Sequence, residues 1–266
     1  MPGSSPRPSI IILLIFSLCY FTVITSSAQG ENKLVAQQIH KPFIILADID
    51  NNLATTNNPI LQVDSIAHTN TSASHFCKAY STSMQNIALQ IQGMDSGAKA
   101  FIQKFEIGFA NYFLIPHYAY RNGSELTGSV WQFFYSSSNA KPWQIILLGV
   151  NAHINGDFWH VLVDNFSEKD IRRYKKEILS TQPSIAKVYD DVFDTIRSQS
   201  WYLRFINFVT FGSAKKFGER VFYKWRKRSV DLAISFYSDP GKFKKRLACI
   251  LRKKQKIDKE IVSHRS

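Results

Sequence analysis

The chain has 266 residues, of which 33 are Lys or Arg and 20 are Asp or Glu, so its formal charge is +13. Hydrophobic residues make up 45% of the chain and aromatic residues 14%, which suits one or two domains and excludes a fully disordered protein. The 12 Gly and 3 Cys exclude collagen-like and disulfide-framework proteins, and a single long apolar run excludes a polytopic membrane protein.

The first residues have the pattern of a secretory signal peptide. The apolar run at residues 10–24 is shorter than the roughly 20 residues that a membrane-spanning helix needs. Arg7 provides a positive flank, and the small residues Ser26 and Ala28 precede a cleavage site after Ala28. We therefore predict a signal peptide at residues 1–28 and a secreted or periplasmic protein. An uncleaved N-terminal membrane anchor is the alternative.

A polar segment, residues 29–73, follows the predicted signal peptide and contains the apolar stretch Phe43–Asp50, which we expect to be extended. Beyond it, apolar residues recur at helical spacing. In chain order, the predicted helices cover residues 74–92, 96–113, 127–136, 142–165, 168–179, 183–208 and 213–237, and a last helix opens at Pro240. The pattern predicts an all-α protein, with one domain of about seven or eight helices at residues 74–238 and a basic C-terminal helix and tail at 239–266.

Capping residues support several of these helix starts. Asp95 can cap the helix that begins at Ser96, and Pro142 suits the first turn of the helix that follows it. Ser167, followed by Asp170, resembles a capping box, although Glu or Gln is the usual residue at the third position.

The predicted helix at residues 142–165 is the most apolar stretch of the mature chain, yet polar side chains interrupt it. These are Asn151, His153, Asn155, Asp157 and His160. At about 100° per residue, the two His and Asp157 share one arc with Gly149, which leaves room above the His153–Asp157 pair, and the two Asn lie roughly opposite. Because a buried carboxylate without a partner is costly, Asp157 must meet a cation, a hydrogen-bond network or a water-filled cleft.

The first hypothesis for this helix is a metal site. His153 and Asp157 are four residues apart and point the same way, and imidazole with carboxylate suits zinc or manganese. His160 could add a third ligand, and His117 and His75 are the best candidates from elsewhere in the chain. One divalent metal, such as zinc, could lower the pKa of a bound water, which would make the protein a metal-dependent hydrolase.

The second hypothesis is a structural polar network without metal. In that arrangement His153 bonds Asp157, while Asn151 and Asn155 satisfy neighbouring helix ends. The protein would then be a non-catalytic binding or structural protein of the cell envelope.

The stretch LLGVNAHINGDFWHVL, residues 147–162, resembles the "GMNAHINxDLPxAL" signature of the domain-of-unknown-function family number 5995. Three further stretches resemble helices of that family in the same order: FCKAYSTSM (76–84), FIQKFEIGFANYF (101–113) and KWRKRSVDLA (224–233). The resemblance covers about residues 75 to 235. It implies a mainly helical fold and carries no established activity.

Within this signature, the family-matching positions are Asn151, His153, Asn155 and Asp157. The residues that follow depart from the family pattern: Phe158, Trp159 and His160 stand where the family usually has Leu, Pro and an aliphatic residue. The resemblance therefore does not imply that His160 is a ligand.

The excess positive charge is concentrated near the C-terminus, where residues 213–266 carry a net charge of +12. The basic helix at residues 242–256 has Phe243, Leu247, Ile250 and Leu251 on one face. We expect the apolar face to pack on the body and the charges to be solvated. The alternative is a peripheral contact of this helix with an anionic membrane surface. Nucleic-acid binding lacks a supporting motif, and a secreted destination argues against it.

Two smaller features of the sequence each have two interpretations. Cys77 and Cys249 could form a disulfide outside the cytoplasm or remain free thiols. The carboxylates of Asp190, Asp191 and Asp194 suit an exposed helix face better than a paired catalytic site.

We predict that a cell exporting the full chain releases a product that begins at Gln29, because cleavage follows Ala28. N-terminal sequencing or the intact mass of the exported protein tests this. A product that keeps residues 1–28 would instead support the membrane anchor.

Overall fold

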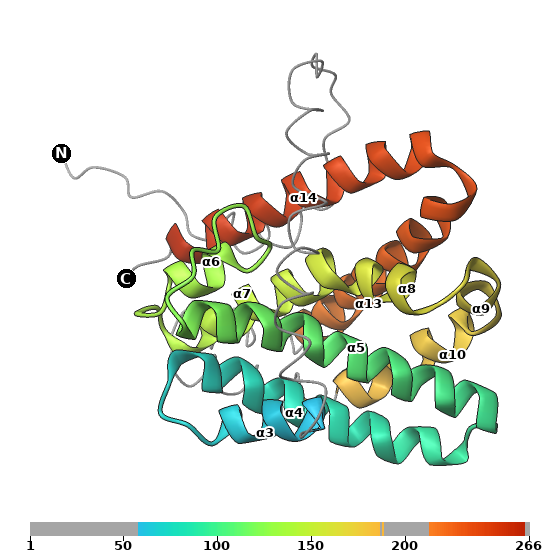
Figure 1. The fold of residues 1–266 in the computed structure, drawn as a ribbon, viewed down its shortest axis with the longest axis horizontal. Helices are drawn as coiled ribbons and strands as arrows, with labels where there is room; N and C mark the ends of the chain where they lie inside the picture. Colours follow the sequence, from blue (N-terminus) through green and yellow to red (C-terminus); the bar gives the residue numbers. More distant parts are fainter. Residues whose placement is uncertain (1–57, 187, 189–212, 264–266) are drawn as a thin grey trace.

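The structure is a computed structural model, and it describes residues 58–186, 188 and 213–263 (Figure 1). These residues form helices and contain no strand, which confirms the all-α prediction. The predicted signal peptide, the apolar stretch Phe43–Asp50 and the acidic residues of the predicted helix 183–208 lie outside the described residues. Within the described ranges, no helix is both long enough and apolar enough to cross a membrane.

The order of the helices follows the predicted order closely. In chain order they are α3 (Pro59–Ala67), α4 (Ser72–Gln90), the 3₁₀ turn η1 (Ile91–Gly93), α5 (Ser96–Arg121), α6 (Gln132–Ser136), α7 (Pro142–Ala152), the π-helical turn η2 (His153–Asp157), α8 (Phe158–Asn165), α9 (Glu168–Arg173), α10 (Lys175–Ser180), α13 (Ser213–Ser238) and α14 (Pro240–Ser263).

The differences from the predicted bounds are local. Helix α3 lies within the segment described above as polar, where Val63 and Ile66 are buried. Helix α6 is shorter than the predicted helix 127–136, and the predicted helix 168–179 is interrupted at Tyr174.

Local capping explains several of the observed bounds. The Asp95 carboxylate accepts a hydrogen bond from the backbone N–H of Ala98, and the Ser167 hydroxyl accepts one from the N–H of Asp170. Each bond satisfies an amide that the first turn of a helix leaves unpaired.

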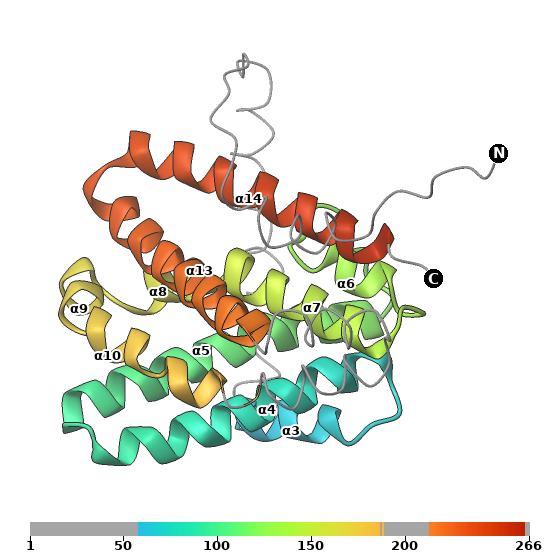
Figure 2. The same ribbon diagram turned by 180° about the vertical axis from the view of Figure 1, so that it is seen from behind.

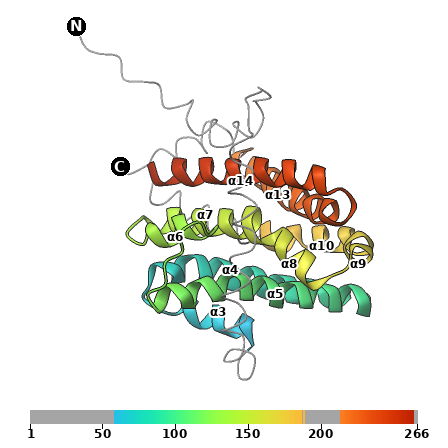
Figure 3. The same ribbon diagram turned by 45° about the horizontal axis from the view of Figure 1, so that its top comes forward.

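The helices lie in three layers, which are clearest in Figure 3. Helices α3, α4 and α5 form one layer, α6 to α10 form the middle layer, and α13 and α14 cover the opposite side (Figures 2 and 3). Helix α7 packs against α4 on one side and α14 on the other, while α8 packs between α5 and α13. The run from α7 to α8 is therefore covered on both sides, which explains why it is apolar around most of its circumference.

Phe76 occupies the centre of an aromatic cluster between α4 and the middle layer. Its ring contacts those of Phe113, Trp131, Phe134 and His153 at centroid distances of 5.3 to 5.8 Å. A Cβ atom added at Gly149 would overlap the Phe76 ring. The prediction that Gly149 leaves free room above the His153–Asp157 pair is therefore wrong, because the phenyl ring fills that space.

Helix α14 belongs to the core. Phe243, Leu247 and Ile250 are buried and Leu251 is half-buried, as expected for a helix that packs its apolar face on the body. Cys77 is buried, Cys249 is half-buried, and both are free thiols. Burial raises the pKa of the Cys77 thiol.

We predict that Gly149→Ala lowers the free energy of unfolding by about 1–3 kcal/mol, because the new methyl group overpacks the core against Phe76. Urea denaturation measures the change. In α13, a Cβ at Gly218 would meet nothing within 4 Å, so Gly218→Ala should instead stabilise by about 0.5–1 kcal/mol. If both variants behaved alike, the close packing at Gly149 would be contradicted.

Candidate functional site

A π-helical turn, η2, interrupts the long run between α7 and α8. The backbone N–H of Phe158 donates to the carbonyl of His153, five residues earlier. Such wide turns inside α-helices often mark functional sites. A Cβ at Gly156 would lie 2.7 Å from Val130, so this turn approaches the neighbouring loop closely. All five residues of η2 are buried, and its polar side chains point to two different faces.

The first face holds His153 and Asp157, each 3% exposed. Nδ1 of His153 lies 3.3 Å from Oδ2 of Asp157, and the same oxygen accepts a hydrogen bond of 2.8 Å from Nε1 of Trp131. Burial raises the pKa of Asp157 well above its usual value, and the Trp131 bond and the positive charge of Lys254 offset part of that rise. Burial also lowers the pKa of His153 well below its usual value.

Aromatic rings enclose the His153 imidazole. It stacks on Phe109 with the ring centroids 3.3 Å apart and the planes 7° from parallel, and Tyr80 meets it edge-on at 4.7 Å. These contacts fix the ring orientation and keep water out of the site. Within the described part of the chain, Nε2 of His153 and the hydroxyl of Tyr80 are buried and have no hydrogen-bond partner.

Glu106 adds a second buried carboxyl group to this region. Burial raises its pKa to about 7, and Arg226 partly offsets that rise. The negative charge of Glu106 contributes to the raised pKa of the Tyr80 hydroxyl. The Arg226 guanidinium is held by the carbonyl of Ile178 and the hydroxyl of Thr181. Glu106 and Asp157 therefore both act electrostatically on the Tyr80 hydroxyl.

Glu106, Tyr80 and Trp131 were not predicted as site residues. The helical spacing of α5 could have identified Glu106. It shares an apolar face with Ile102 and Phe109, and a charged side chain on such a face is unusual.

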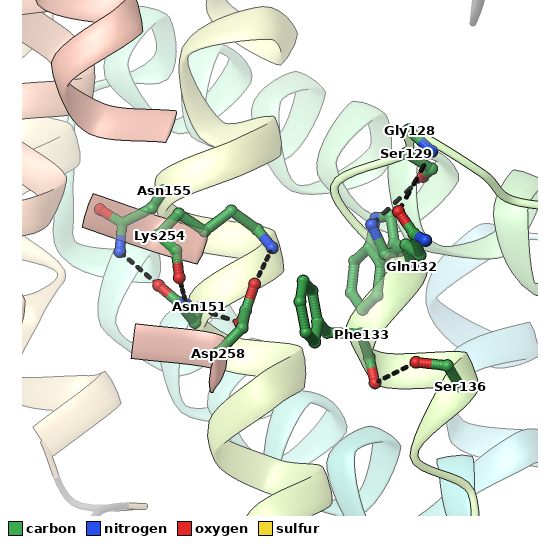
Figure 4. A network of polar contacts seen from close by, with 10 residues as sticks. Gly128, Ser129, Gln132, Phe133, Ser136, Asn151, Asn155, Lys254 and Asp258 are labelled. Atoms are coloured by element: carbon green, nitrogen blue, oxygen red, sulfur yellow. Dashed lines mark hydrogen bonds and ion pairs between the residues drawn. The ribbon is translucent and has the colours of Figure 1, made fainter. Parts of the chain in front are cut away.

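The second face holds Asn151 and Asn155 and is closed by α14 (Figure 4). Asn151 Nδ2 donates to the carbonyl of Lys254 at 3.0 Å and to Oδ1 of Asp258 at 2.8 Å. Asn155 Nδ2 donates to Oδ1 of Asn151 at 2.8 Å. Lys254 Nζ donates to Oδ2 of Asp258 at 2.6 Å, which completes a buried network between α7, η2 and α14.

This network encloses a buried ion pair, with Lys254 4% and Asp258 0% exposed. Burial raises the pKa of Asp258, while Lys254 and the Asn151 amide act in the opposite direction. Removing one partner of such a pair leaves an uncompensated charge and typically costs about 3–5 kcal/mol. The second face therefore matches the hypothesis of a structural polar network.

The structure brings together only two of the predicted metal ligands, His153 and Asp157. His75 is exposed on α4, and His117 is buried in α5 beside Phe113. Burial lowers the pKa of His117 to about 4.

His160 lies in α8 against Trp159 and Tyr112, and burial lowers its pKa to about 4. Among all the residues that the structure describes, no group of three or more His, Cys, Asp or Glu side chains could hold a metal ion.

The fold and the site define an all-helical protein with a buried His–Asp pair at its centre. Residues 60–261 match the family of unknown function DUF5995, and the chain belongs to that family. The matched range contains both faces of η2 and almost the whole described fold. No curated protein and no solved structure matches the chain.

We predict that Glu106→Gln changes how stability depends on pH. Below about pH 4.5 the carboxyl group is protonated in both folded and unfolded chains, so the variant and the wild type should be similar. Between that pH and about 7, the unfolded wild type releases the proton first, so wild-type stability falls relative to the variant. The deficit should reach about 3 kcal/mol above pH 7.

Urea denaturation of both proteins from pH 4 to pH 8 measures this difference in stability. Groups that titrate in both proteins contribute equally, so the difference reports on Glu106 alone. Glu125→Gln, at an exposed position, is the matched control for the chemical change. A constant difference between wild type and Glu106→Gln across this range would contradict a raised pKa for Glu106.

Proposed function

We propose that the protein binds a small hydroxyl-bearing molecule at the His153 face of η2. The observation that carries the proposal is that Nε2 of His153 is buried without a hydrogen-bond partner among the described residues, although Asp157 and four aromatic rings hold the imidazole in place. A buried polar atom in native proteins is normally paired, so an unpaired one beside a positioned side chain favours a ligand. The Tyr80 hydroxyl is also buried without a partner in the described part of the chain, and its ring lies 4.7 Å from that imidazole.

The chemistry of the pair favours a hydroxyl group. When Asp157 is ionised, a neutral His153 carries its one proton on Nδ1, which donates to the carboxylate, and Nε2 accepts a hydrogen bond. When Asp157 is protonated, Nδ1 accepts from the carboxyl group, the imidazole carries its proton on Nε2, and Nε2 donates one. A hydroxyl group can serve either state, because it donates and accepts. Glu106 supplies a third proton-exchanging group with a pKa of about 7, which suits acid–base work near neutral pH.

Access to this site depends on α4. Phe76 and Tyr80 both belong to this helix, and both cover the imidazole. A movement of α4 away from α7 would therefore open one route by which a bound molecule could exchange. The predicted signal peptide supports a further part of the proposal, namely that binding takes place outside the cytoplasm.

We predict that the His153→Phe variant folds and loses the ligand. Phe keeps the stacking on Phe109 and removes both ring nitrogens. A panel of small alcohols, phenols and sugars would be screened by thermal unfolding of the full chain. A ligand at about 100 times its Kd should raise the free energy of unfolding by about 2.7 kcal/mol in the wild type and leave His153→Phe unchanged.

His117→Phe is the matched control, because His117 is 4% exposed and its Nδ1 is also buried without a partner in the described chain. This control should respond to the ligand like the wild type. If no compound in the panel distinguished the three proteins, the first face would be a closed structural core like the second.

Elemental analysis separates this proposal from the metal-dependent hydrolase. The full chain would be purified without chelator beside His153→Ala and Asp157→Ala. Near-stoichiometric zinc, manganese or iron that both substitutions abolish would show a metal site instead of a hydroxyl-binding site. The further metal ligands would then lie outside the described residues.

A further inference from the structure

The outward face of α14 carries a dense row of positive charge. At about 100° per residue, seven exposed basic residues fall within an arc of about 140°. They are Lys242, Lys245, Arg246, Arg252, Lys253, Lys256 and Lys259. The buried residues Phe243, Leu247 and Ile250 lie on the opposite side of the helix. From Lys242 to Lys259 the row is about 26 Å long, at 1.5 Å per residue.

These charges are not neutralised by ion pairs with other described residues. Across residues 58–186 and 213–263, no ion pair involves any of the seven. Two acids adjoin the row. Glu260 is half-buried at its C-terminal end, and the Asp239 carboxylate accepts a hydrogen bond from the backbone N–H of Lys242. Lys254 also belongs to α14, but it is buried and paired with Asp258, so it does not belong to the exposed row.

We propose that α14 lies flat on a membrane surface rich in anionic lipids and binds it through this row of Lys and Arg. A straight helix that presents charges along one line matches a planar array of headgroups, and each basic residue near such a surface contributes favourably. The arc contains no aromatic side chain on which a base could stack, as single-stranded nucleic acid would require. Because the apolar face of α14 is buried in the core, attachment is electrostatic and reversible.

Vesicle binding by the full chain tests this proposal. The probes are phosphatidylcholine vesicles with and without about 30 mol% phosphatidylserine, and the readout is the ratio of the two partition coefficients. Because the apolar segment at residues 10–24 is the same in every variant, it cannot account for a difference between them. The quadruple substitution Lys245→Gln, Arg252→Gln, Lys256→Gln and Lys259→Gln should lower this ratio roughly a thousandfold.

A control of equal charge is available on other helices. Lys78, Arg121, Lys169 and Lys176 are exposed and belong to no ion pair of the described residues. Their combined substitution by Gln should leave the ratio within about threefold of wild type, because charge far from the membrane is screened. Raising NaCl to about 1 M should abolish the preference for anionic vesicles in all proteins.

Three results would overturn the proposal: equal binding of the wild type to both kinds of vesicle, an equal loss in the control quadruple variant, or tighter binding to a short DNA duplex than to anionic vesicles at the same salt. The last result would assign the row to nucleic acid instead. Circular dichroism of both quadruple variants verifies that α14 still folds, and each substituted side chain is exposed.

Discussion

The burial of polar side chains in one turn at the centre of three layers of helices is the constraint on which the structure depends. Helix α7, η2 and α8 are covered from both sides, so each polar group of η2 must find its partner in the protein or in a bound ligand rather than in bulk water. An unpaired buried donor or acceptor costs about 1–3 kcal/mol, and a buried charge costs more. Several features of distant segments follow from this requirement, including the ion pair of α14 and the position of Trp131.

The two faces of η2 meet the constraint in different ways. On the Asn face, Asn151 bonds to backbone and side chain of α14, and the Lys254–Asp258 pair completes the set. On the His face, Trp131 satisfies one oxygen of Asp157, yet Nε2 of His153 remains without a partner in the described chain. The Asn face therefore suits a purely structural role, whereas the His face has hydrogen-bonding capacity left for a ligand.

His153 and Glu106 contribute to stability with opposite dependence on pH. Burial lowers the pKa of His153, so protonation of the imidazole destabilises the fold as the pH falls below the usual range for His. Burial raises the pKa of Glu106 to about 7, so ionisation of the carboxyl group destabilises the fold as the pH rises toward that value. Both groups therefore favour their neutral forms, which is the expected response of ionisable side chains to a dry aromatic environment.

Helix spacing predicted most of the fold, because amphipathic periodicity and caps such as Asp95 act locally. The same local information identified Asn151, His153, Asn155 and Asp157 and their division between two faces. It could not identify Trp131 or Lys254 as partners, since these residues lie 26 residues from Asp157 and 103 from Asn151 along the chain. It also misjudged Gly149, because the size of the space above a glycine depends on which side chain of another helix enters it.

Helix α14 links the interior of the protein to its most charged surface. The Lys254 side chain points inward and donates to Asp258, and its backbone carbonyl accepts from Asn151. Its neighbours Lys253 and Lys256 are exposed on the outer arc. The charge of Lys254 also offsets part of the rise in the pKa of Asp157, so α14 influences the electrostatics of the His face. A displacement of α14 would break the Asn151 bonds and remove a cation from the neighbourhood of Asp157. The position of this one helix therefore sets both the stability of η2 and the electrostatics of its candidate binding site.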